Sequence, residues 1–173
     1  NDWSTLSQLV SKNDQVIGAA PYVDAEAMLS NQGSVSGAIV RGILPEFEPT
    51  VSEIHQNMVS GKLDDLEPGE YGIVLGTGLA NTLDVVPGDR VTMITPQSTV
   101  SALGFMPRLR RFKVVGLFEI GVYEYDKSSA LIHAQDASKL FRLQGDMTGI
   151  RLKLKNMDEA PLVRHQLREE LGF

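Results

Sequence analysis

The segment from Gly149 to Lys155 alternates apolar and charged side chains without a break. On an extended chain these side chains lie on opposite faces: Ile150, Leu152 and Leu154 against Arg151, Lys153 and Lys155. This period of two predicts a β-strand with one buried face. A helix is expected to follow from about Asp158, because apolar residues recur there at every fourth position: Val163, Leu167 and Leu171.

A β-hairpin and a short helix are predicted near the start of the chain. Residues 22–29 alternate apolar and polar side chains, and a second strand pattern covers residues 34–44. The turn sequence Asn-Gln-Gly at 31–33 separates them, so the two strands should pair with one face buried. An amphipathic helix is expected over residues 2–11, because its apolar side chains have helical spacing: Trp3, Leu6, Leu9 and Val10.

The rest of the chain mixes further helices and strands. By the same patterns, helices are expected over residues 51–61, 78–83 and 134–143, and strands over residues 71–75, 90–94, 111–120 and 128–133. The mixture places the chain in the α+β class, with mostly antiparallel sheets, packed helices and a protruding hairpin loop. No repeat or low-complexity linker divides the chain, so we expect residues 1–173 to form one folded unit with two lobes.

The composition argues against several functions. A net charge of −6 does not suit nonspecific nucleic-acid binding, which needs a basic surface. The absence of cysteine excludes disulfides, thiolate zinc sites and cysteine nucleophiles. No stretch approaches the roughly 18 apolar residues of a membrane-spanning helix. We therefore expect the chain as given to be soluble, with any membrane helices in flanking sequence.

No side-chain pattern typical of catalysis is found. His55, His133 and His165 lie far apart in the sequence, and none has a metal-ligand partner at helical spacing. Gly76 and Gly78 follow a predicted strand, but the third glycine of a dinucleotide site is missing, so a tight turn before a helix is expected. We expect a non-catalytic domain without metal or cofactor. The alternative, a small enzyme with scattered site residues, would need a deep pocket with convergent polar groups.

An apolar loop is predicted between two central strands, at residues 96–107. Pro96 and Pro107 bound it, Gly104 lies within it, and three apolar side chains have no place in a core pattern: Leu103, Phe105 and Met106. Prolines stiffen such a loop and reduce the entropy lost on docking. Basic side chains at its base would attract an acidic partner: Arg108, Arg110 and Arg111. The alternative is that the apolar side chains fold back onto the domain.

Motifs between Leu66 and Leu143 resemble those of a transporter family. In order, they are LEPGEYGIVLGTGLANTLDVVPGDRVTMITP, MPRLRRFKVVGLFEIG and YEYDKSSALIHAQDASKLFR. Their order and spacing resemble the periplasmic domain of lipoprotein-releasing ABC-transporter permeases of the LolC, LolE and LolF types. The resemblance implies the two-lobed α+β core domain that MacB-like and FtsX-like permeases share, on the periplasmic face of the bacterial inner membrane.

The resemblance also implies partners. Such a permease works with a separate LolD-type ATPase and a second permease subunit to extract lipoproteins and pass them to the chaperone LolA. In the LolC type, the proline-bounded loop is a hook that enters the chaperone's hydrophobic cavity above a basic pad. Pro96 and Pro107 match the boundaries of the hook, and Arg110 matches a pad position.

The match to the hook and pad is incomplete. Thr92 and Leu109 stand where the family carries Arg and Gln, and the loop is slightly short, which leaves a LolE-type or merged LolF-type subunit open. The sequence also leaves open a homodimer or a heterodimer of permeases. A MacB-like or FtsX-like domain, acting in efflux or in cell-wall hydrolase activation, is the alternative function.

Overall fold

The computed structural model describes residues 3–101 and 104–172, without the side chains of residues 97–101, 105 and 106. Its eight strands belong to one sheet. They are β1 (Val16–Asn31), β2 (Ser34–Ile43), β3 (Met58–Ser60), β4 (Gly72–Gly76), β5 (Arg90–Ser101), β6 (Gly104–Phe118), β7 (Ser129–His133) and β8 (Gly149–Leu154). The α-helices are α1 (Trp3–Val10), α2 (Thr77–Leu83), α3 (Tyr123–Ser128), α4 (Ala134–Leu140) and α5 (Ala160–Leu171). Short 3-10 turns are η1 (Glu48–Thr50), η2 (Ile54–Gln56), η3 (Leu63–Asp65) and η4 (Met157–Glu159).

The sheet closes on itself around the main core. The strands follow the order β2, β7, β4, β6, β5, β1, and β1 pairs back onto β2. The β2–β7 and β4–β6 pairs are parallel and the other pairs are antiparallel, which confirms the predicted α+β class. Fully buried side chains from every strand of this ring fill the core, among them Leu29, Val40, Ile73, Met93, Phe112 and Ile132.

The predicted N-terminal hairpin is confirmed. β1 and β2 pair from Tyr22 opposite Ile43 to Asn31 opposite Ser34. Both turn residues have positive φ, 46° at Gln32 and 91° at the following glycine. Two-residue hairpin turns of this kind need positive φ at both positions, which explains why the turn contains glycine.

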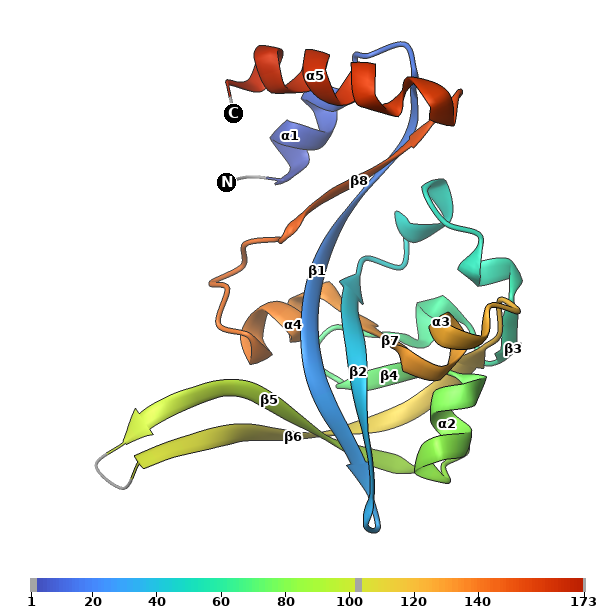
Figure 1. Ribbon diagram of the computed structural model, residues 1–173, viewed down its shortest axis with the longest axis vertical. Helices are drawn as coiled ribbons and strands as arrows, with labels where there is room; N and C mark the ends of the chain where they lie inside the picture. Colours follow the sequence, from blue (N-terminus) through green and yellow to red (C-terminus); the bar gives the residue numbers. More distant parts are fainter. Residues whose placement is uncertain (1–2, 102–103, 173) are drawn as a thin grey trace.

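Strand β1 is shared by two parts of the molecule. Residues 16–22 pair with β8, whereas residues 22–31 pair with β2. At the β8 end, α1 and α5 pack together in a separate apolar cluster around Val10, Val163 and Leu167. Figure 1 shows α1 and α5 at one end of the molecule, with both ends of the chain beside them.

The helices differ from the prediction at two places. The helix expected over residues 51–61 is wrong, because the chain forms η2 and β3 there. Polar side chains bond to the local backbone instead: Ser52 Oγ accepts from the N–H of Ile54 at 3.1 Å, and Asn57 Nδ2 donates to the carbonyl of Glu53 at 2.9 Å. Such bonds compete with a continuous helix. Helix α3 was not predicted, since its residues have no clear apolar period.

Candidate functional site

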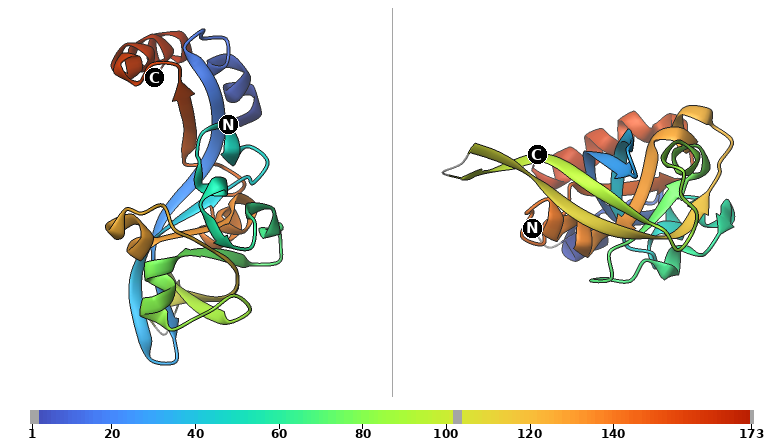
Figure 2. Two further views of the ribbon diagram at one scale, coloured as in Figure 1. Left: turned by 90° about the vertical axis from the view of Figure 1, so that its right-hand side faces the viewer. Right: turned by 90° about the horizontal axis from the view of Figure 1, so that it is seen from below.

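The predicted hook is the outer half of a β-hairpin. β5 and β6 pair continuously from Arg90 opposite Lys113 to Thr95 opposite Arg108, and pairing resumes further out up to Ser101 opposite Gly104. Most of the stretch expected as a loop is therefore strand. Figures 1 and 2 show this hairpin arm projecting from the body of the domain.

The two prolines lie where the arm leaves the body. The register shifts between Thr95 and Ser98, a stretch that contains Pro96, and Pro107 pairs with Ser98 just beyond the shift. Proline has no N–H to donate to the ladder, and bulges are a common place for it in sheets. Both prolines are exposed. They thus mark the base of the arm.

The tip of the arm is only partly described. Leu103 lies outside the described residues, and so do the side chains of Phe105 and Met106. Gly104 is exposed and has a φ of 108°, a conformation that favours glycine. The docking role of the three apolar side chains stays a prediction.

The three pad arginines point to opposite faces of the hairpin. Successive side chains alternate across a strand, so Arg108 and Arg110 share the face of buried Phe112, which is turned towards α4. Arg111 lies on the other face, with Leu109 and Lys113. We call these the inner and outer faces of the hairpin. The sequence predicted one basic pad, whereas the structure divides it.

Both inner-face arginines have defined partners. Arg108 Nη1 donates to the carbonyl oxygen of Leu140, the last residue of α4, at 2.8 Å. A cation is favourable there because carbonyls at a helix C-terminus carry partial negative charge. The guanidinium carbon of Arg110 lies 3.7 Å from the centre of the Tyr71 ring. This distance is within the range of a cation–π contact.

Tyr71 is itself held by a buried carboxylate. Asp136 in α4 is fully buried. Its two oxygens accept from the backbone N–H of Gly69 at 2.7 Å and from that of Tyr71 at 3.2 Å. The Tyr71 ring also meets Phe112 edge to face, with centroids 5.6 Å apart. The sequence analysis did not identify Asp136 or Tyr71 as site residues.

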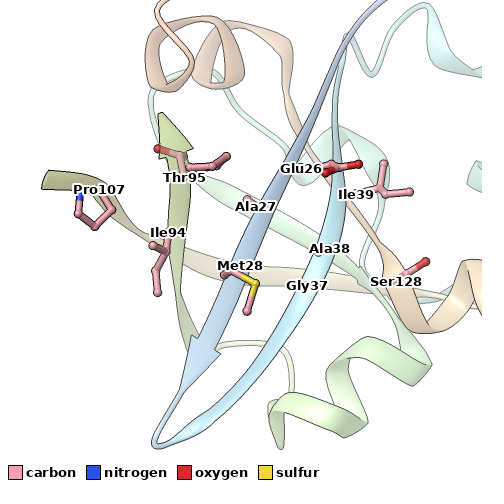
Figure 3. A pocket seen from close by; sticks show the side chains of 11 residues that line it. Glu26, Ala27, Met28, Gly37, Ala38, Ile39, Ile94, Thr95, Pro107 and Ser128 are labelled. Carbon is pink, nitrogen blue, oxygen red and sulfur yellow. The ribbon is translucent and has the colours of Figure 1, made fainter. Parts of the chain in front are cut away.

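An apolar groove lies on the outer side of the sheet at the base of the arm (Figure 3). Its volume is about 500 Å³, and Met28, Ile39 and Ile94 line it together with Pro96 and Pro107. Met28 and Ile39 are 43% and 49% exposed. At the floor of the groove β1 pairs with β2, and it pairs with β5 from Met28 to Ser30.

The groove lacks the polar groups expected of an enzyme pocket. The polar side chains among its lining residues are those of Glu26, Thr95 and Ser128. In the described part of the chain, no group of three His, Asp or Glu side chains is close enough to hold a metal ion.

The other residues considered for chemistry have local structural roles. His133 is buried at the start of α4, where Nδ1 accepts from the N–H of Gln135 at 3.1 Å. Burial lowers the pKa of the His133 ring. Gly76 and Gly78 lie against the backbone of α3, and a Cβ at Gly76 would be 2.2 Å from the carbonyl oxygen of Asp126. These glycines allow α2 and α3 to approach closely.

Sequence comparison identifies curated relatives along nearly the whole chain. The chain is 44% identical over 169 residues to the lipoprotein-releasing system transmembrane protein LolC of Neisseria meningitidis, covering 98% of this chain and 41% of the relative. It is 29% identical to the LolE protein of the same system in Haemophilus influenzae, over 88% of this chain and 36% of the relative. The chain thus spans about two fifths of the length of these relatives.

Solved structures share the fold at low identity. The periplasmic region of MacB from Actinobacillus actinomycetemcomitans matches with a TM-score of 0.59 and 16% identity, over 97% of this chain and 72% of that one. The extracellular domain of the ABC-type transporter YknZ matches with a TM-score of 0.57 and 12% identity, over 95% of this chain and 81% of that one. None of the helices described for this chain is long and apolar enough to cross a membrane.

A family model supports the same assignment. The model described as the MacB-like periplasmic core domain matches residues 1–170. The chain therefore belongs to the family of MacB-like periplasmic core domains.

Proposed function

We propose that this domain is the periplasmic part of a lipoprotein-releasing ABC-transporter permease, and that its hairpin arm docks the chaperone LolA. The observation that carries the proposal is the position of the arm. It projects from the domain at residues 96–107, where the LolC-type hook is expected, within a chain 44% identical to a LolC protein. In this role the domain is non-catalytic, and a LolD-type ATPase and a second permease subunit act through parts outside it.

The arrangement of the chain ends supports this role. Both ends lie beside α1 and α5, at one end of the molecule, and the arm projects from the other part (Figures 1 and 2). Sequence continuing from both ends would therefore leave the domain on the same side. If that sequence forms inner-membrane helices, the arm extends from the part of the domain farther from the membrane, where a soluble chaperone can reach it.

The test is calorimetric titration of the domain with LolA from the same organism, at low and at physiological salt. We expect saturable binding that weakens as salt screens the arginines. Replacement of residues 97–106 by a short Gly-Ser turn should abolish it. A control variant in the β1–β2 turn, Gln32→Asn, should bind normally. Binding that survives loss of the arm would refute the docking proposal.

The tip is tested separately by the double substitution Phe105→Ala and Met106→Ala. Each side chain contributes about 1.5 to 3 kcal/mol if it is fully buried in the partner. The affinity for LolA should therefore fall by at least tenfold. Full binding by this variant would show that the tip does not enter the chaperone.

The MacB-like or FtsX-like role is the alternative. The likeness to MacB and YknZ, at 16% and 12% identity, supports the fold alone. The identity of 44% to a LolC protein favours the lipoprotein-releasing role. Saturable binding to an efflux channel protein or to a hydrolase activator, without binding to LolA, would favour the alternative.

A further inference from the structure

We infer that Tyr71, held by the buried carboxylate of Asp136, is a positioning residue that presents the Arg110 guanidinium to a carboxylate-bearing partner on the inner face of the hairpin. The inference rests on the proposed docking function and assigns the face on which docking occurs. It also assigns roles to two residues that lie outside the arm.

The first step is that Arg110 is held in place at the surface. Its side chain is exposed, yet its guanidinium carbon lies 3.7 Å from the Tyr71 ring centre. Stacking on an aromatic face leaves the edge of the guanidinium, which carries the N–H donors, free to bind a carboxylate. A side chain held in this way loses less conformational entropy when it binds.

The second step is that the ring of Tyr71 is itself fixed. Tyr71 has a φ of 52°, the left-handed conformation that non-glycine residues seldom adopt. Such a conformation persists only where the surroundings enforce it. Here Asp136 accepts from the N–H of Tyr71, and the carbonyl of Tyr71 accepts from the N–H of Lys113 in β6 at 3.0 Å. The backbone of Tyr71 is thus tied to both α4 and the hairpin, and its ring packs edge to face against Phe112.

The third step is the contrast with the outer face. Arg111 is the neighbour of Arg110 in sequence and is also exposed, but it lies on the face opposite to Tyr71 and α4. There Arg90 stands directly opposite Lys113 on the paired strand. Like charges in such a pair repel each other. Among the side chains that the structure describes on this hairpin, only Arg110 on the inner face stacks on an aromatic ring.

The experiment is a double-mutant cycle with LolA binding as the readout. Tyr71→Leu should weaken binding roughly three- to tenfold, because the guanidinium loses its support. Tyr71→Phe keeps the aromatic face and should stay within about twofold of the unmodified domain. In an Arg110→Ala background, Tyr71→Leu should have almost no further effect. An equal loss in both backgrounds would overturn the inference, since Tyr71 would then not act through Arg110.

Two matched controls separate this role from general stability. Arg111→Ala tests a neighbouring charge on the outer face and should weaken binding less than Arg110→Ala. Tyr123→Leu removes an exposed tyrosine that also lies near a cation, with Lys127 Nζ 5.4 Å from its ring, and should leave binding unchanged. A larger loss from Arg111→Ala than from Arg110→Ala would place docking on the outer face and overturn the inference.

A second readout needs no chaperone. The Nε–Hε signal of Arg110 in NMR spectra of the domain alone should carry a ring-current shift, which Tyr71→Phe keeps and Tyr71→Leu removes. Arg110→Lys retains the positive charge and leaves Tyr71 unchanged. It should bind LolA as weakly as Tyr71→Leu. Absence of LolA binding by the unmodified domain would refute the proposed function. An unshifted Arg110 signal would refute the positioning role.

Discussion

The guanidinium of Arg151 in β8 donates a hydrogen bond to the carboxylate of Glu48 in η1. Glu48 is only 1% exposed, and its partner comes from a strand more than a hundred residues later. The ion pair joins the β8 side of the molecule to the segment that follows β2. Glu48 depends on this partner, because its carboxylate alone would be a buried charge without compensation, whereas the side chain of Arg151 is 24% exposed.

Glu48→Ala should therefore destabilise the domain. The variant leaves the partly buried guanidinium of Arg151 without its carboxylate, and an unpaired donor of this kind costs about 1 to 3 kcal/mol. Urea denaturation followed by circular dichroism measures the free energy of unfolding. Glu169→Ala is the control: it removes the partner of His165 in an exposed pair and should change stability by less than about 0.5 kcal/mol. Equal effects of the two substitutions would contradict the role of burial.

Gly76→Ala should disrupt the contact between α2 and α3. The added methyl group would lie 2.2 Å from a backbone carbonyl oxygen of Asp126, so the two elements would have to separate. We expect a loss of about 1 to 3 kcal/mol, typical of overpacking. Gly37→Ala is the matched control, because its nearest neighbour, Met28 Sδ, would be 3.9 Å away. A melting temperature that falls equally in both variants would count against the close approach.

The stability of the domain should fall in mild acid partly through His133. Burial lowers the pKa of this ring from its ordinary value of 6.5 in the folded protein. The unfolded chain therefore binds the proton more readily, and stability is lost as the pH drops below about 6.5. His133→Asn keeps an acceptor for the N–H of Gln135 and removes the titrating group. Urea midpoints between pH 7.5 and 5.5 should change less in this variant. Identical pH dependence in both proteins would exclude the contribution.

Leu167→Ala should loosen one part of the molecule selectively. Leu167 is buried in the cluster between α1 and α5, apart from the main core. Because local opening follows local packing, amide hydrogen exchange should accelerate in α1, β8 and α5. Exchange in β4 and β7 should stay nearly unchanged. Uniform acceleration throughout the domain would indicate one cooperative unit instead of two lobes.

Most of the fold could be predicted from side-chain periodicity. The alternation of residues 149–155 predicts β8, and the Asn-Gln-Gly turn predicts the hairpin of β1 and β2. The helix predicted over residues 51–61 is wrong. Three apolar residues have helical spacing there, but polar side chains bond to the local backbone and prevent a continuous helix. The closure of the sheet depends on which strands pair at long range, which periodicity does not determine.

The candidate site could be predicted only in part. The prolines and the arginines were identified from their place in the sequence. The division of the three arginines between two faces follows from the register of β5 and β6. That register places Phe112 in the core and so fixes which side chains of β6 share its face. The support of Arg110 by Tyr71 could not be foreseen. It depends on a positive φ at Tyr71 and on a carboxylate, Asp136, that lies 65 residues away.

The sharing of β1 has a consequence for how this domain can be divided or recombined. Its 16 residues pair with β8 along one half and with β2 along the other. Two chain segments join the main core to the α1–α5 cluster: residues 141–148 form no helix or strand, whereas β1 runs through both parts without a loop. Any cut within β1 would leave each cluster with half a strand and an unpaired ladder. The two parts cannot be exchanged between proteins as independent cassettes, and a transplanted hairpin arm would need the end of β1 beside it, where Met28 to Ser30 pair with β5.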